Sequence, residues 1–284
     1  ALIDLSVYSK ESHVALAAIA ERNSISPQYL EQVFAALRKA GIIKSGCHVV
    51  TTKQQPDAAR VIKDTCSRLE VPCVVSDPDE AVLEAESVFG QRFSYKGEEF
   101  EISLAGVYQK ENAVLALNAL EELDQLGWHT TMEQRKDGLL HTSWKGRFTV
   151  ICKKPLFIVD GAHNAGAADK MAESIRHYFK GKKLIYIMGV FADKEYNLVL
   201  EKTAHFAEKI YTIETPDNPR ALPAEELAKA ARVYNSSAES TKSIKDAVEK
   251  AFSCAGDDEN SVILAFGSLS FIGALTNAVE EYVG

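Results

Sequence analysis

A polar corner after a short apolar run is the stretch of this chain best equipped for chemistry. Residues 156–159 have the pattern of a buried strand, the polar run 160–164 breaks it, and a helical pattern follows over 167–178. In an α/β sheet, ligands bind where a strand's carboxyl end leads into a helix. The free backbone N–H groups of the helix N-terminus favour anions there. Asp160 and His163 could reach a polyphosphate nucleotide and its metal from such a corner, and the sequence therefore predicts a nucleotide site.

The elements that would position this corner follow from a change of pattern after Trp144. Apolar, strand-like runs alternate with helical patterns to the end of the chain. The strand-like runs lie at 148–159, 184–190, 209–213 and 261–266. The helical patterns lie at 167–178, 195–207, 223–233, 242–252 and 271–282. This alternation predicts an α/β fold with a mostly parallel sheet covered by helices on both faces. In such a sheet the ends of later strands would bring Asp193, Lys194 and Ser268 to the edge that holds Asp160.

The stretch from 47 to 146 also mixes strands and helices. Strand-like runs at 49–52 and 71–75 flank an amphipathic helical pattern at 56–69. Residues 89–104 alternate in hydrophobicity around the turn Lys96-Gly97-Glu98, which predicts a β-hairpin. A longer helical pattern runs from 111 to 126 and stops at Gly127.

Composition and charge limit the classes of function that we expect for this chain. A chain of 284 residues with 46% hydrophobic and 25% charged residues fits an ordinary globular protein with room for two domains. The net charge of −8 argues against nonspecific nucleic-acid binding by the whole chain. The five cysteines form no C-x-x-C pair and no zinc spacing, which predicts reduced thiols and a cytoplasmic location. Small and polar residues interrupt the most apolar stretch, 262–283, so we expect no membrane partner.

Residues 1–46 read as a helix-turn-helix. Apolar residues recur at helical spacing on both sides of a polar break at 23–26, where Ser26 and Pro27 are typical of a helix start. The segment closely resembles the winged helix-turn-helix repressors of iron–sulfur and cysteine metabolism. It stops before the glycine-rich wing and the cysteine cluster of that family. A helical packing unit without a DNA role is the alternative, and DNA is the less expected partner.

The rest of the chain, from Lys39 onward, resembles folylpolyglutamate synthase, also called dihydrofolate synthase, of the Mur ligase superfamily. The motifs that carry the resemblance occur in the family's order: KAGIIKSGCHVVTTKQQPDAARVI, LAGVYQKENAVLALNALEEL, WKGRFTVICKKPLFIVDGAHNAGA, GVFADKEY, TPDNPRALPAEELA and FGSLSFIGAL. The resemblance implies that 47–146 is the tail of the central ATPase domain and that 147–284 is the C-terminal α/β domain. It implies ATP and Mg²⁺ as cofactors, folate or dihydropteroate and L-glutamate as substrates, and a role in one-carbon metabolism.

The same resemblance assigns nucleotide-site residues. It implies that Asn112 contacts adenine, that Arg147 reaches the phosphates, and that Asp160 and His163 contact the ribose and the phosphates. Lys39 aligns with a lysine that is carbamylated in the family and helps to hold a metal, so catalytic roles would fall to Lys39 and His163. Local structural roles are the alternatives: helix caps for Asn112 and Asp160, a loop charge for Arg147, a backbone-bonded ring for His163 and a helix-end charge for Lys39.

Three further residues, Asp193, Lys194 and Ser268, fall at the glutamate end of the implied cleft. The chain departs from the family pattern at three positions, where Lys145 and Ala165 replace prolines and Ser270 replaces an aromatic residue.

A larger departure is that the sequence contains no G-x-x-x-x-G-K-[ST] loop to cradle phosphates. We therefore expect little ligase activity from this chain alone, and an inactive fusion remnant is an alternative. Unpaired strand edges in the ATPase tail would favour self-association. Both resembled families carry Lys39-Ala40-Gly41-Ile42 at matching places, which is typical of recombination, a fusion artefact or an engineered chimera.

Overall fold

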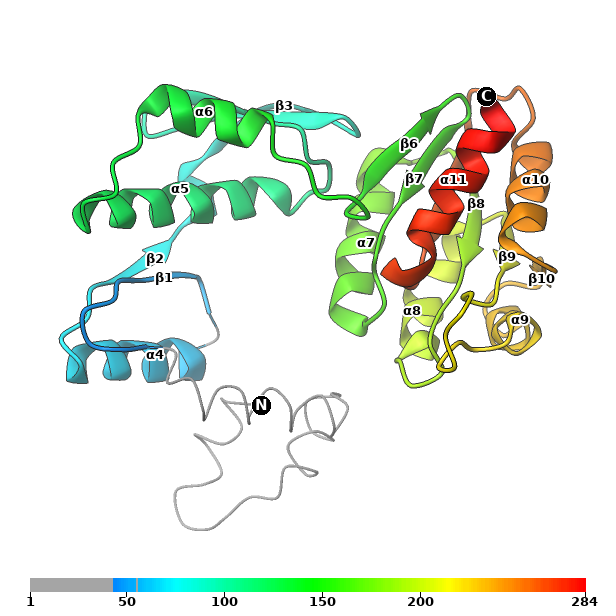
Figure 1. Cartoon of the computed structure of the whole chain (residues 1–284), viewed down its shortest axis with the longest axis horizontal. Coiled ribbons are helices and arrows are strands. Elements are labelled where there is room, and N and C mark those ends of the chain that lie inside the picture. Colours follow the sequence, from blue (N-terminus) through cyan, green and yellow to red (C-terminus); the bar gives the residue numbers. More distant parts are fainter. Residues whose placement is uncertain (1–42, 55) are drawn as a thin grey trace, which may run out of the picture. The chain divides into compact units, whose positions relative to one another are not determined.

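The computed structural model describes residues 43–54 and 56–284, which divide into two compact units (Figure 1). The first contains the described residues up to Ala81 together with Glu111–Arg135, and the second contains Val82–Lys110 and Lys136–Gly284. Lys39 and nearly all of the predicted helix-turn-helix lie outside the described residues. Parts of the predicted 47–146 segment thus fall with the C-terminal sheet. No helix of the described ranges is long and apolar enough to cross a membrane.

The first unit is built around two parallel strands, β1 (Val49–Thr52) and β2 (Cys73–Ser76), which helix α4 (Pro56–Arg68) connects. Helix α5 (Gln109–Gln125) contributes most of its length to this unit. The buried Asn118 amide of α5 donates to Ser76 Oγ at 2.9 Å and so ties the helix to the end of β2.

The second unit begins with a small antiparallel sheet of β3 (Val82–Ser87), β4 (Gly90–Tyr95) and β5 (Glu98–Ile102). The predicted hairpin is confirmed as β4 and β5, whose alternating residues bury Phe93, Tyr95 and Phe100. Strand β3 and helix α6 (Met132–Leu140) were not predicted, because neither carries a buried apolar face.

A six-stranded sheet forms the rest of the second unit, in the order β10-β9-β8-β11-β7-β6. Its strands are β6 (Thr149–Lys153), β7 (Leu156–Val159), β8 (Lys183–Met188), β9 (Lys209–Thr212), β10 (Ala238–Ser240) and β11 (Ser261–Phe266). All neighbours pair in parallel except β6 and β7. The mostly parallel sheet is thus confirmed, while the single strand-like run at 148–159 is in fact an antiparallel pair.

Helices cover both faces of this sheet. Helices α7 (Ala165–Tyr178), α8 (Tyr196–Thr203) and α9 (Ala224–Arg232) pack on one face, and α10 (Ile244–Ala255) and α11 (Ile272–Val283) pack on the other. Strand β8 shows the alternation that builds both cores: Leu184, Tyr186 and Met188 join the first cluster, whereas Ile185 and Ile187 join the second. Because both faces are buried, the strand reads as a continuous apolar run.

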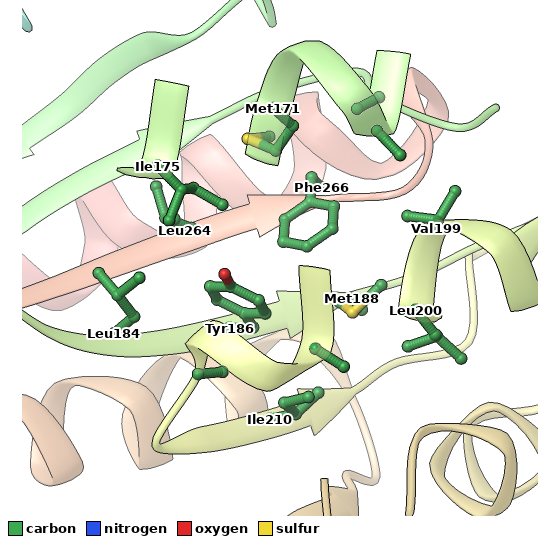
Figure 2. Packing of buried hydrophobic residues seen from close by; sticks show 14 of the residues in the cluster. Met171, Ile175, Leu184, Tyr186, Met188, Val199, Leu200, Ile210, Leu264 and Phe266 are labelled. Carbon is green, nitrogen blue, oxygen red and sulfur yellow. The ribbon is translucent and has the colours of Figure 1, made fainter. Parts of the chain in front are cut away.

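The Tyr186 side chain places a polar hydroxyl group inside the first of these two hydrophobic cores. Figure 2 shows the ring among apolar side chains, including Phe266, whose ring centre lies 5.0 Å away in an edge contact. Tyr186 is fully buried, and its Oη has no hydrogen-bond partner among the described residues. Burial raises the pKa of this phenol strongly, so the group stays neutral.

We expect Tyr186→Phe to raise the free energy of unfolding by about 1 kcal/mol, because it removes a buried polar group that gains no bond. Urea denaturation measures the change. Tyr178→Phe is the matched control: its hydroxyl donates to Glu86 at 3.2 Å, so its loss should destabilise. A loss of stability in Tyr186→Phe as large as that of the control would contradict the expectation.

Candidate functional site

Three strand ends converge at the carboxyl edge of the six-stranded sheet. The parallel register pairs Val159 of β7 with Ala265 of β11, and Phe266 of β11 with Met188 of β8. The next backbone bonds continue this pairing beyond the strands, since Asp160 N donates to Ala265 O at 2.9 Å. The segments that follow β7, β8 and β11 therefore meet at one edge, as the sequence predicted for a ligand site.

Asp160 is the buried anchor of this edge. Its side chain is 5% exposed, its Oδ2 accepts from Phe148 N at 2.8 Å, and its Oδ1 accepts from Ala162 N at 2.7 Å. Burial raises the pKa of Asp160, and the two backbone N–H donors partly offset that effect. Each carboxylate oxygen thus accepts one backbone N–H and keeps capacity for a further bond, so a structural role of Asp160 is compatible with a contact to a ligand.

Through these bonds Asp160 holds the linker before β6. Phe148 has φ of +45°, a left-handed conformation that is costly for a bulky residue. Its buried ring stacks on Phe179 at 6.1 Å between ring centres. Gly161 N also donates to Gly146 O at 2.8 Å. The corner and the linker therefore form one hydrogen-bonded structure, which sets the path of the chain at Arg147.

A small cavity of about 130 Å³ lies beside this linker. It is lined by Tyr108, Arg147, Phe148, Asp160, Ala167, Lys170 and Met171. Burial, with the nearby Asp160 carboxylate, raises the pKa of Tyr108 to about 12, so its hydroxyl is a neutral hydrogen-bonding group. Arg147 is half-buried, with its guanidinium 6.0 Å from the Trp144 ring centre. Arg147 and Lys170 give the lining two cations, which suits an anionic group.

A larger cavity of about 450 Å³ lies at the same edge. Its lining consists of His163, Phe191, Lys194, Arg220, Gly267, Ser268, Leu269 and Ser270. His163 Nδ1 lies 2.7 Å from Gly161 O, so we assign the ring proton to Nδ1, which leaves Nε2 of the neutral ring as an acceptor. The Lys194 ammonium forms no salt bridge with a carboxylate of the described residues, although its charge helps to lower the pKa of the neighbouring Asp193. The cavity therefore combines the Lys194 ammonium with a histidine whose Nε2 is available as a hydrogen-bond acceptor.

Arg220 is a residue of this cavity that the sequence reasoning missed. Its Nε and Nη2 donate to the two Asp193 oxygens at 3.1 and 2.5 Å, and its guanidinium lies 4.8 Å from the Phe191 ring centre. The Arg220 hydrogen bond lowers the pKa of Asp193. Asp193 thus holds the arginine rather than lining the cavity. The sequence signal that could have found Arg220 is its place in the segment TPDNPRALPAEELA, which follows β9.

Ser268 is placed by the turn that follows β11. The side chain is 5% exposed, and its Oγ accepts from Ser270 N at 3.2 Å and lies 2.7 Å from Ser270 Oγ. Gly267 before it has φ of +117°, and a Cβ there would lie 2.5 Å from Gly189 O. Only glycine fits this close approach of the β8 and β11 ends.

Within the second unit, the predicted residues line two cavities. His163, Lys194 and Ser268 line the larger cavity, whereas Arg147 and Asp160 line the smaller one. Asn112 is exposed on α5 in the first unit. In residues 43–54 and 56–284, no group of three or more His, Cys, Asp or Glu could hold a metal ion.

Comparison with known proteins finds relatives of the C-terminal part of the chain. Residues 146–269 match the model of the Mur ligase, glutamate ligase domain. A dihydrofolate synthase/folylpolyglutamate synthase from Bacillus subtilis is 32% identical over 250 residues, which cover 85% of this chain and 57% of that protein. A folylpolyglutamate synthase from Lacticaseibacillus casei is 31% identical over 195 residues, which cover 66% of this chain and 45% of that protein.

Solved structures show the same likeness. The folylpolyglutamate synthase of Thermotoga maritima superposes with a TM-score of 0.69 at 26% identity, covering 88% of this chain and 58% of that one. The Mycobacterium tuberculosis enzyme, solved with ADP and AMPPCP, shares the fold with a TM-score of 0.70 at 24% identity, covering 87% of this chain and 58% of that one. The chain spans about half the length of the curated relatives that it matches.

A second match covers the N-terminus. Residues 1–46 match the model of an iron-dependent transcriptional regulator. The HTH-type regulator IscR of Pectobacterium carotovorum is 35% identical over 82 residues, which cover 29% of this chain and 46% of that protein. One chain therefore joins segments that resemble two unrelated families, as the sequence predicted.

Proposed function

Because residues 146–269 are a Mur ligase, glutamate ligase domain in a chain homologous to folylpolyglutamate synthases, we propose that the chain serves an ATP-dependent ligase that joins L-glutamate to a folate or dihydropteroate carboxylate. The larger cavity is the observation that carries this proposal. It combines Lys194 with the Arg220 guanidinium, which keeps N–H donors beyond the two that Asp193 accepts. These groups suit the carboxylates of a dicarboxylic amino acid.

The residues of the smaller cavity and of the linker beside it are proposed to bind the nucleotide. Arg147 would neutralise phosphate oxygens of ATP, while Asp160 would hold the linker that presents it. Asn112 is proposed for the adenine. ATP would activate the folate carboxylate as an acyl phosphate, which the glutamate amine attacks with release of phosphate. His163 Nε2 could accept a proton at this edge.

Within the described residues, magnesium fits only together with the nucleotide. The described residues offer no cluster of three ligands, and each Asp160 oxygen already accepts a backbone N–H. Mg²⁺ is commonly held by one or two protein groups plus substrate phosphates. We propose that it arrives with ATP, and that Lys39, which lies outside the described residues, would be its protein ligand if carbamylated.

The proposal predicts a specific loss when the Lys194 ammonium is removed. We expect Lys194→Met to weaken binding of L-glutamate at least tenfold, because a charge-assisted hydrogen bond contributes about 1.5–3 kcal/mol. Isothermal titration with L-glutamate, in the presence of a non-hydrolysable ATP analogue, measures the affinity.

Lys180→Met is the matched control, since this exposed lysine follows α7 away from the cavity. Equal affinities in all three proteins would exclude Lys194 from the glutamate site. In the same preparations, folate- and glutamate-dependent ATP turnover should be very low, because the 284 residues hold no glycine-rich phosphate loop.

DNA binding is the second candidate function. It rests on the match of residues 1–46 to a transcriptional regulator, against a net charge of −8 for the whole chain. A gel-shift titration that shows a salt-sensitive complex would support it, because phosphate contacts release counterions. Absence of such a complex would leave the ligase proposal as it stands.

A further inference from the structure

Leu269 contacts the residues of both cavities of the candidate site. Its side chain lines the larger cavity and is 46% exposed. The same side chain packs on two buried glycines from other segments of the chain. A Cβ on Gly161 would lie 2.4 Å from Leu269 Cδ2, and a Cβ on Gly146 would lie 2.8 Å from the same atom. Leu269 therefore occupies the space that side chains at both glycine positions would take.

The two glycines join the segments that hold the smaller cavity. Gly161 N donates to Gly146 O at 2.8 Å. Gly146 directly precedes Arg147, and Gly161 directly follows Asp160, and both of these neighbours line the smaller cavity. Leu269 thus packs at the point where the linker meets the strand-to-helix corner.

The backbone of Gly161 shows that space, rather than conformation, requires glycine at this position. Its φ lies outside the left-handed region, so a residue with a side chain could adopt it. A Cβ there would also lie 2.6 Å from Leu269 Cγ, which is too close for any real contact. The glycine at position 161 therefore makes room for the leucine. Gly146, with φ of +79°, favours glycine for its conformation as well.

Leu269 extends from a turn that is itself fixed. It begins a short 3₁₀ helix, Leu269–Phe271, whose N-cap is Ser268; the Ser268 Oγ accepts from Ser270 N at 3.2 Å. Phe271 and Ile272, which follow, are buried in the second core cluster. Because the residues on both sides of Leu269 are held in place, the leucine is a fixed surface against which the linker packs.

We propose that Leu269 is a positioning residue: it holds Gly146 of the linker against Gly161 of the corner, and so sets the place of the Arg147 guanidinium in the smaller cavity. The inference rests on the proposed function in one respect, which is that Arg147 contacts the phosphates of ATP. A side chain that is 46% exposed contributes only part of the burial energy of a core leucine, so its main effect falls on the segments that it contacts.

Hydrogen exchange of the full chain tests the positioning without any ligand. The Gly161 amide, which donates to Gly146 O, is followed by NMR in the wild type and in Leu269→Ala. We expect its exchange to be about tenfold faster in the variant, because loss of the leucine methyl groups opens this hydrogen bond to water. The amides of β8 are the internal reference, since a general loss of stability would speed their exchange too, and we expect no change there.

Two further variants control for chemistry and for exposure. Leu269→Met should keep the slow exchange of the Gly161 amide, because methionine has a similar volume. Leu140→Ala is the matched control, since Leu140 is 40% exposed, ends α6 and lines neither cavity. It should leave the exchange of the Gly161 amide unchanged.

A double-variant cycle measures the consequence for the nucleotide. Binding of a magnesium-bound, non-hydrolysable ATP analogue is measured by isothermal titration. We expect Leu269→Ala to weaken binding about fivefold when Arg147 is present and not to weaken it further in Arg147→Ala, because the leucine acts through the arginine. Gly161→Ala, whose Cβ would displace the leucine side chain, should weaken binding in the same way.

The outcomes separate this inference from the ligase proposal. Unchanged exchange of the Gly161 amide in Leu269→Ala would overturn the inference, and so would equal weakening of nucleotide binding with and without Arg147. If the wild type binds no nucleotide, the ligase proposal fails, whereas faster exchange confined to the Gly161 amide would still support the placement of the linker by Leu269.

Discussion

Asp160→Ala is expected to lower the free energy of unfolding of the C-terminal unit by about 3 kcal/mol. The substitution removes the acceptor for two backbone N–H groups, those of Phe148 and Ala162, and a buried unpaired donor costs about 1–3 kcal/mol. It also removes the bond that holds Phe148 in its left-handed conformation. Part of the loss is offset, because burial raises the pKa of Asp160 and the ionised carboxylate is itself costly in this environment.

The measurement is urea denaturation followed by the fluorescence of Trp144, which precedes Arg147 by three residues, in a background in which Trp128, the other tryptophan, is replaced by Phe. Asp169→Ala is the control on the same side of the fold: Asp169 is exposed on α7 and pairs with Lys202. We expect the control to change stability by less than about 1 kcal/mol, as exposed ion pairs do. If the two variants lose similar small amounts, Asp160 is not the anchor of the linker.

Gly267→Ala is expected to cost about 3 kcal/mol or more and to deform the larger cavity. The new Cβ would lie 2.5 Å from Gly189 O, and φ of +117° is strained for any residue with a side chain. Relief would require the ends of β8 and β11 to move apart, and Ser268 would move with them. A crystal structure or a comparison of amide chemical shifts would locate the displacement, and urea denaturation would give its cost.

Gly273→Ala is the matched control for this prediction. Gly273 lies within α11, and beyond the adjoining helix backbone no atom lies within 4 Å of the place that an alanine Cβ would take. Alanine there should raise stability by about 0.5–1 kcal/mol, because glycine is a poor helix former. A Gly267→Ala protein as stable as the wild type would contradict the close approach of the two strand ends.

The six-stranded sheet could be predicted because its signal is local. Strand β11 occupies 261–266 as expected, and both clusters of the core follow from alternate residues of buried strands such as β8. The run at 148–159 was misread as one strand because both halves are apolar, and the turn between them carries only Lys154 and Pro155. Helix α7 begins at Ala165, two residues before the predicted start, because Asn164 caps it by accepting from Ala167 N.

The candidate site was only partly predictable because it depends on contacts between distant segments. The strand-to-helix corner with His163 was predicted from residue types and spacing, and Lys194 from its place at the end of a later strand; both residues line the larger cavity. The Asp193–Arg220 ion pair joins loops that follow different strands, and no local sequence pattern predicts such a pair. Nor could spacing show that Asp160 would bond to Phe148, twelve residues upstream.

Nucleotide titration of the full chain tests the central claim most directly. Melting of the protein is followed against increasing magnesium-bound, non-hydrolysable ATP analogue, for the wild type, Arg147→Ala and the surface control Arg176→Ala. A ligand that binds the folded state stabilises it by about 2.7 kcal/mol at a concentration about a hundred times its Kd. We predict a saturable rise in Tm for the wild type and the control, and a much smaller rise for Arg147→Ala. The absence of any rise in the wild type, or equal rises in all three proteins, would contradict the account.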